Sequence, residues 1–196
     1  MKYDFVNIIL TAGGPKALYK IIDQFEPDFP LPILFLSSLP PTFDDMFVQI
    51  VSEKSQLPIS VVEHKTFLKR EMLVSKAGYY FQVSKNKELN IKKIEPDKCF
   101  INEFIKDSYS NSLNFITIVL AGMLISDKIL EACSFLKEKD YPILVQDIYS
   151  NPNIQLQYED SLPAKIIENN FYSHKIPLEK IIPTLNQLIG KDNENR

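Results

Sequence analysis

The chain has few cysteines and no long apolar run, and these shortages exclude several classes of protein. Cys99 and Cys133 are its two cysteines and lie outside any C-x-x-C spacing, so neither a disulfide framework nor a zinc site is indicated. The longest apolar stretch, 115–125, is shorter than the roughly 20 residues that a bilayer-spanning helix needs. The N-terminal apolar run, interrupted by Asn7 and lacking a cleavage-type tail, predicts a strand rather than a signal peptide. We therefore expect a cytoplasmic protein that does not insert into membranes.

The chain also lacks a block of charge of one sign. Acidic and basic residues alternate along its 196 residues, and the formal net charge is −3. Nucleic acid is therefore not an expected partner. The composition, 45% hydrophobic and 24% charged, is that of a globular protein. With no internal repeat and no long linker, the sequence predicts one domain over 1–190 and a polar tail over 191–196; the oligomeric state is left open.

Apolar runs of strand length alternate with segments of helical period, a pattern typical of the α/β class. Strands are expected at 5–10, 32–36, 59–62, 115–120 and 143–145. The segment 71–95 has no helical period and predicts short strands joined by turns. The predicted fold is therefore a doubly wound, mostly parallel sheet with a small antiparallel hairpin. Helices are expected between the strands, among them 99–110, 162–169 and a last stretch over 178–189 that Pro183 should kink or divide.

Three strand-to-loop junctions carry glycine or serine. They are Thr11-Ala12-Gly13-Gly14, Ser37-Ser38 and Gly122-Met123. Ligands in open α/β sheets bind at the carboxyl ends of the strands, which predicts a cleft lined by Thr11, Ser38 and the loop 122–127. On periodicity alone, ordinary turn chemistry is the preferred interpretation of the same residues, because glycine and serine are common in such loops.

The junctions resemble the motifs of the chemotaxis protein-glutamate methylesterase, CheB. Thr11-Ala12-Gly13-Gly14-Pro15 is similar to that family's Ser-Thr-Gly-Gly-Pro, and Leu120-Ala121-Gly122-Met123 to its Leu-Thr-Gly-Met. Further matches in the same order are Ser37-Ser38-Leu39-Pro40, Val74-Ser75-Lys76-Ala77-Gly78, Gln146-Asp147 and Leu162-Pro163. The resemblance runs from about residue 5 to residue 189, and four of the five glycines fall on glycine positions of the family.

The resemblance implies a degenerate member of that family. Its nucleophilic serine falls on Thr11, its histidine base on Ser38, and its aspartate on Ser126, or on Asp127 after a one-residue slip. The lining of the cleft would be Ala12, Gly13, Ser37, Gly122 and Met123. A serine hydroxyl cannot serve as a base at neutral pH, so a binding or regulatory module without ester hydrolysis, and without a cofactor or metal, is expected.

Two alternatives remain open on the sequence. A hydrolase could use Thr11 with a relocated base, for which His64 and His174 are the chain's two histidines. Tyr79, Tyr80 and Phe81 could form either the core of the hairpin or a rim for a protein partner, and core is the preferred interpretation.

A chemotaxis receptor or another signalling protein is the expected partner. Methylesterases of this kind carry an N-terminal receiver domain, and no receiver precedes the first strand here, so an excised domain and a stand-alone module both fit.

Overall fold

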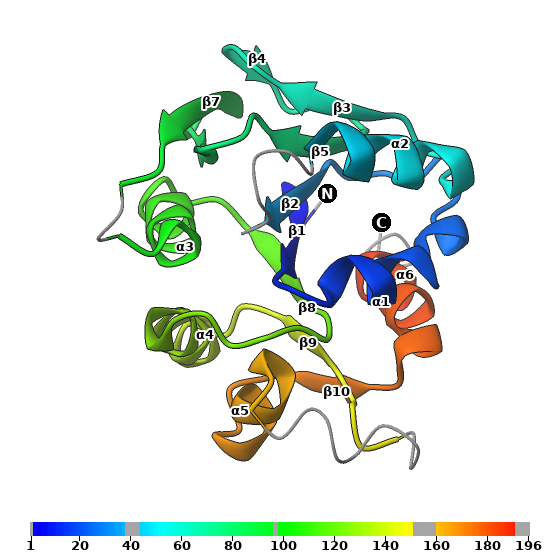
Figure 1. Cartoon of the computed structure of the whole chain (residues 1–196). Helices are drawn as coiled ribbons and strands as arrows, with labels where there is room; N and C mark the ends of the chain where they lie inside the picture. Colours follow the sequence, from blue (N-terminus) through cyan, green and yellow to red (C-terminus); the bar gives the residue numbers. More distant parts are fainter. Residues whose placement is uncertain (1, 38–43, 96–97, 151–159, 191–196) are drawn as a thin grey trace.

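The computed structural model describes residues 2–37, 44–95, 98–150 and 160–190. Seven strands form its main sheet: β1 Phe5–Leu10, β2 Ile33–Ser37, β3 Ile59–Val62, β5 Met72–Ser75, β8 Phe115–Val119, β9 Ile143–Gln146 and β10 His174–Ile176. All neighbouring pairs in this sheet are parallel, in the order β10-β9-β8-β1-β2-β5-β3 (Figure 1). The expected doubly wound, mostly parallel sheet is thus confirmed.

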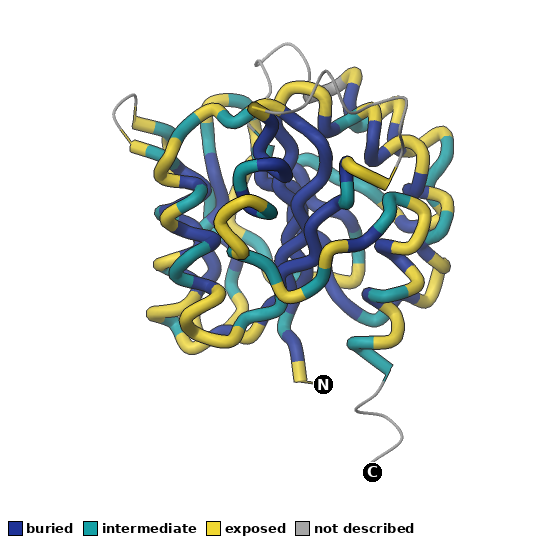
Figure 2. The backbone as a smooth tube through the Cα atoms, turned by 90° about the horizontal axis from the view of Figure 1, so that it is seen from below, coloured by how far each residue is buried: buried dark blue, intermediate teal, exposed yellow. Residues whose placement is uncertain are grey.

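Helices cover both faces of the main sheet. One face packs against α1 (Gly14–Tyr19), α2 (Asp44–Lys54) and α6 (Ile181–Gly190). The other face packs against α3 (Phe100–Ser110) and α4 (Asp127–Glu138). A further helix, α5 (Leu162–Glu168), contributes buried residues to both apolar clusters. Figure 2 shows the buried strands in the centre of the molecule and the exposed residues on the outer surfaces of the helices.

Because both faces are covered, the central strands are mostly apolar, with Asn7 and Thr117 as buried polar exceptions in β1 and β8. Every residue of β1 is buried, and the same is true of β8 and β9. Val6 and Ile8 belong to one apolar cluster, whereas Phe5 and Ile9 belong to the other, as the alternation of side chains along a strand requires. The apolar runs at 5–10 and 115–120 were therefore reliable signals for strands.

The segment 71–95 divides between two sheets. Its first strand, β5, lies in the main sheet between β2 and β3. The remainder forms an antiparallel hairpin of β6 (Tyr79–Val83) and β7 (Glu88–Lys93), to which β4 (Thr66–Phe67) adds a third strand. Tyr80 and Phe81 are buried, as the preferred interpretation of these aromatic residues expected.

Two helical segments differ in detail from the expectation. The first helix is short, and a 3₁₀ turn over Ile22–Gln24 continues its apolar face. At the C-terminal end, a 3₁₀ turn over Leu178–Lys180 precedes α6, and Pro183 lies in the first turn of α6, where the missing N–H of proline is tolerated. None of the helices in the described ranges has the length and apolar character needed to traverse a bilayer.

Candidate functional site

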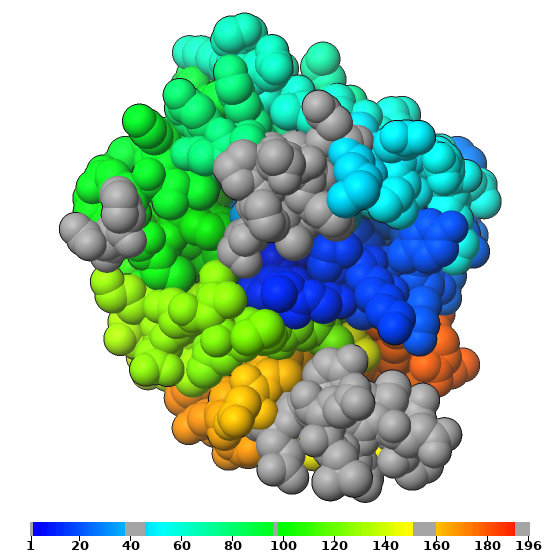
Figure 3. All heavy atoms as spheres, viewed as in Figure 1, coloured from blue at the N-terminus to red at the C-terminus, as the bar shows by residue number. Residues whose placement is uncertain are grey.

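The strand order reverses at β1, which pairs with β2 on one side and with β8 on the other. Thr11 directly follows β1, and Gly122 lies three residues after β8. The two loops touch, because the N–H of Met123 donates to the carbonyl oxygen of Ala12 at 3.0 Å. Figure 3 shows the segments after β1 and β8, dark blue and yellow-green, next to each other on one face of the molecule. Two of the three predicted junctions therefore meet at the topological switch point, where such folds bind ligands.

Thr11 is covered by the backbone of Gly122. The threonine is 1% exposed, and its Oγ1 has no hydrogen-bond partner among the described residues. A Cβ atom built on Gly122 would collide with that Oγ1 and would lie 3.3 Å from both the carbonyl carbon and the Cβ of Thr11. Glycine at position 122 thus permits the close approach of the two loops, and this approach shields the threonine hydroxyl from solvent.

The turn after Thr11 depends on two glycines. Gly13 has a φ of +102°, a left-handed conformation that favours glycine. The N–H of Gly14 donates to the carbonyl oxygen of Thr11 at 2.8 Å and closes the turn. Ala12 and Gly13 are exposed, and Met123 is 62% exposed. The surface at this edge is consequently made by small residues and one long apolar side chain, while the hydroxyl of Thr11 lies beneath it.

Gln146, the last residue of β9, holds the loop after β8 in place. Its Oε1 accepts a hydrogen bond from the N–H of Ala121 at 2.7 Å, and the contact is buried. The motif Gln146-Asp147 was recognised in the sequence, but no role was assigned to it. The spacing between residues 121 and 146 gave no indication that one would bond the other.

We expect Gln146→Met to lower the free energy of unfolding by about 1–3 kcal/mol, because it leaves the buried N–H of Ala121 without an acceptor. The measurement is urea denaturation followed by circular dichroism. Gln56→Met, the same change at an exposed position, is the matched control and should alter stability by less than about 0.5 kcal/mol. Equal stability of the two variants would contradict the role assigned to Gln146.

The N-terminus of α5 forms a third part of this edge. The N–H of Leu162 donates to the carbonyl oxygen of Gly122 at 2.8 Å, and Ser161 forms an isolated antiparallel bridge with Met123. Ser161 also caps α5, since its hydroxyl accepts from the N–H of Ala164 at 3.3 Å. The loop after β8 is therefore fastened to β1, β9 and α5, and Ser161 is a residue that sequence reasoning missed.

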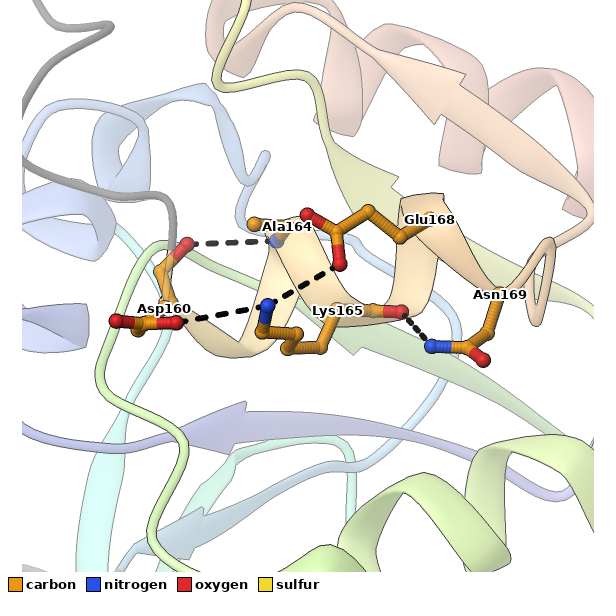
Figure 4. A network of polar contacts seen from close by, with 6 residues as sticks. Asp160, Ala164, Lys165, Glu168 and Asn169 are labelled. Atoms are coloured by element: carbon orange, nitrogen blue, oxygen red, sulfur yellow. Dashed lines mark hydrogen bonds and ion pairs between the residues drawn. The ribbon is translucent and has the colours of Figure 1, made fainter.

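Beside this cap lies a small ionic network (Figure 4). Lys165 on α5 places its Nζ 3.2 Å from Glu168 and 3.5 Å from Asp160. The hydrogen bond to Glu168 raises the pKa of Lys165, so its amine stays protonated at neutral pH and is not a candidate base. Burial raises the pKa of the Cys133 thiol to about 12, so this cysteine remains protonated at neutral pH.

The remaining predicted triad positions have structural roles or lie outside the described residues. Ser38 lies outside them; the preceding Ser37 ends β2, and its Cα pairs with that of Leu10. Ser126 caps α4, because its hydroxyl accepts from the N–H of Lys128 at 3.3 Å. Asp127 is exposed in the first turn of that helix, where a carboxylate stabilises the helix dipole.

Both histidines of the chain lie far from Thr11. His64 follows β3 and His174 opens β10, and these are the two outer strands of the main sheet. Each outer strand is three strand spacings from β1, or about 14 Å. His174 also lies at the amino end of its strand, since it pairs with Leu144 while Ile176 pairs with Gln146. No group of three or more potential metal ligands occurs in the described part of the chain.

The sequence model of the CheB methylesterase family matches residues 6–185. The chain belongs to the CheB methylesterase family. A protein-glutamate methylesterase/protein-glutamine glutaminase of Trichodesmium erythraeum is 22% identical over 200 residues, which cover 97% of this chain and 54% of that protein. A protein of the same name from Clostridium acetobutylicum is 28% identical over 127 residues, covering 60% of this chain and 36% of that protein. The chain thus spans about half the length, or less, of these CheB relatives.

The fold agrees with a solved CheB domain. The crystal structure of the Thermotoga maritima CheB methylesterase catalytic domain superposes with a TM-score of 0.77 at 19% identity. The match covers 96% of this chain and all of that domain. The chain therefore has the CheB catalytic-domain fold.

Proposed function

We propose that this CheB-family domain is a binding or regulatory module of chemotaxis signalling that does not hydrolyse esters. The observation that carries the proposal is the burial of the Thr11 hydroxyl beneath Gly122. Both histidines of the chain lie on or just after the outer strands of the main sheet, and these strands are three strand spacings, or about 14 Å, from β1. A nucleophile of this type needs a base within hydrogen-bond reach and a path for the substrate. Thr11 has neither among the described residues.

The residues at the family's catalytic positions support the same proposal. The resemblance assigns the base to Ser38 and the orienting carboxylate to Ser126, and neither hydroxyl can take up a proton at neutral pH. Ser126 instead caps α4. Loss of the base in a serine-type triad costs about 10⁴-fold or more in rate, so the domain would bind through its surface rather than act through its triad.

The partner that suits this edge is a segment of a chemotaxis receptor or of another signalling protein. Ala12, Gly13 and Met123 are exposed there, and Ile125 is 46% exposed. These side chains offer apolar contact without charge, on a loop fixed by Gln146 and α5. The alternative function is a working methylesterase and glutaminase that uses Thr11 with a rearranged base. The names of the CheB relatives favour this alternative.

We expect wild-type protein to release methanol from a methylated receptor, and ammonia from its glutamines, no faster than buffer alone. Thr11→Ala should give the same result, because the buried hydroxyl takes no part. The informative comparison is a restored variant, Thr11→Ser with Ser38→His and Ser126→Asp. Aspartate also caps helices well, so α4 should be retained in this variant, and its turnover tests whether the fold still supports the reaction.

Hydrolysis by the wild type that disappears in Thr11→Ala would overturn the proposal and establish Thr11 as a nucleophile. Hydrolysis that persists in Thr11→Ala would place the activity at another site and would overturn it as well. Wild-type protein that shows no hydrolysis but binds the cytoplasmic part of a receptor supports the proposal, provided that Met123→Ser weakens the binding. The control is Met46→Ser, at another exposed methionine, which should leave the binding unchanged.

A further inference from the structure

The short strand β4 carries the most exposed phenylalanine of the described chain. Phe67 is 58% exposed and pairs with Glu88 across β4 and β7. This strand is the edge of the three-stranded sheet, with β7 as its neighbour on one side. A large apolar side chain on an open strand edge is a feature that proteins normally suppress unless it binds something.

Five cationic residues lie near Phe67, either in the sequence or across the pair of strands β4 and β7. Lys65 precedes it by two residues, and Lys69 and Arg70 follow closely. The hydrogen bond from the N–H of Leu68 to the carbonyl oxygen of Lys87, at 3.0 Å, brings the turn with Lys85 and Lys87 alongside. We call this set the Phe67 surface: Lys65, Phe67, Lys69, Arg70, Lys85 and Lys87.

Charge on the Phe67 surface is only partly balanced. Lys65 pairs with Glu88 and Lys87 with Asp4, both at 2.8 Å, yet the two lysine side chains remain 59% and 57% exposed. The other three cations, Lys69, Arg70 and Lys85, are exposed and form no ion pair with a described residue. The chain has no basic block in its sequence, and the pairing of β4 with β7 creates this cluster in space.

Net charge differs between this part of the chain and the rest. Residues 63–98 contain nine Lys and Arg and five Asp and Glu, which gives a net charge of +4. The remainder of the chain contains 13 Lys and Arg and 20 Asp and Glu, which gives a net charge of −7, so that the whole chain has −3. The net negative charge of the remainder repels an extended anionic surface such as a membrane or a nucleic acid. A short acidic segment would touch the Phe67 surface alone.

The Phe67 surface is distant from the switch-point edge. Asp4, which pairs with Lys87, directly precedes β1, and Thr11 directly follows it. Seven steps of about 3.3 Å along the extended chain separate the two by about 23 Å. Figure 1 accordingly shows β4 and β7 at one end of the molecule, away from β9 and β10.

We propose that the Phe67 surface docks a short acidic protein segment that carries an apolar side chain. Carboxylates of the segment would pair with Lys69, Arg70 and Lys85, and its apolar side chain would cover Phe67. The open edge of β4 suits an extended partner, since edge strands accept added strands. The proposal is independent of ester hydrolysis, because no residue of the Phe67 surface belongs to the switch-point edge.

The test uses a fluorescein-labelled peptide, Glu-Glu-Leu-Glu-Glu-Phe, titrated with the full chain by fluorescence anisotropy at low and at physiological salt. We expect Lys69→Glu with Arg70→Glu and Lys85→Glu to weaken binding at least about tenfold. The matched control reverses three exposed lysines elsewhere, Lys106→Glu with Lys137→Glu and Lys180→Glu, and should weaken it less than about twofold. Both triple variants have the same net charge of −9, six units below the wild type's −3.

Phe67→Ala should weaken binding about threefold or more at either salt concentration, whereas the contribution of the charges should fall as salt rises. Equal weakening by the two triple variants would show a general charge effect and overturn the proposal. So would the absence of peptide binding in the wild type. Tighter binding to phosphatidylglycerol vesicles or to oligothymidylate than to the peptide, lost in the first triple variant, would assign the surface to a membrane or a nucleic acid instead.

Discussion

Phe5→Ala is expected to lower the free energy of unfolding by about 3–5 kcal/mol. Phe5 is fully buried on β1, stacks on Phe115 of β8 with ring centroids 5.1 Å apart, and meets Phe104 of α3 edge-on at 5.8 Å. The substitution removes a whole ring from a close-packed layer between sheet and helix, so both the burial of apolar surface and the ring contacts are lost.

Urea denaturation measures this loss, and the chain supplies its own control. Phe67→Ala makes the same chemical change at a side chain that is 58% exposed, and we expect it to alter stability by less than about 1 kcal/mol. Comparable losses in the two variants would mean that the packing of Phe5 is not what stabilises the centre of the sheet.

Gly122→Ala is the second substitution with a large expected effect, a loss of about 1–3 kcal/mol from overpacking. The added methyl group would collide with Oγ1 of Thr11, and the neighbouring Thr11 atoms are backbone or Cβ and cannot move aside easily. Thr11→Ala alone should be nearly neutral or stabilising, because it removes a buried hydroxyl that has no hydrogen-bond partner among the described residues.

The double variant Gly122→Ala with Thr11→Ala tests the contact itself. The double variant should recover part of the lost free energy of unfolding, because the Oγ1 that blocks the methyl group is then absent. The recovery should be incomplete, because the two distances of 3.3 Å to the backbone carbon and Cβ of residue 11 remain. Thermal unfolding of the wild type, both single variants and the double variant completes the cycle. Strictly additive effects would show that the two residues do not press on each other.

Several strands of the main sheet could be predicted closely from their apolar or β-branched runs; β1 and β8 are buried throughout, whereas the outer strand β3 is only partly buried. The expected 5–10 and 59–62 match β1 and β3, and 115–120 differs from β8 by one residue. An apolar run indicates that a strand is buried, but it does not indicate which of the two sheets contains that strand. Met72–Ser75 was therefore placed with the antiparallel strands, although it lies between β2 and β3 in the main sheet.

The two shortest edge strands, β4 and β10, gave no usable signal. The strand β10 spans His174–Ile176, and its first two residues, His174 and Lys175, are polar. It pairs with a neighbouring strand on one side only. The two-residue β4 is similar. Their existence depends on a neighbouring strand that supplies hydrogen bonds, so a local pattern of side chains cannot reveal them.

The proximity of the loops after β1 and β8 could be expected from the sequence, but the geometry of their contact could not. Glycines after two strands indicated that Thr11 and Gly122 lie at the same edge, and the contact between Ala12 and Met123 joins those loops. That Gly122 covers the hydroxyl of Thr11 depends on how tightly two loops pack. The buried acceptor Gln146 depends likewise on the position of a third strand.

The central place of β1 has a consequence for synthesis on the ribosome. One of its partners, β2, follows within 33–37, but the other, β8, begins only at Phe115, 105 residues after Leu10. At the usual 5–20 residues per second of translation, the growing chain waits roughly 5–20 seconds for that strand. Meanwhile Phe5 and Ile9, which α3 and α4 will cover, stay open to water. The nascent chain therefore carries an apolar strand face without its β8 neighbour for several seconds, and exposed apolar surface of this kind favours aggregation.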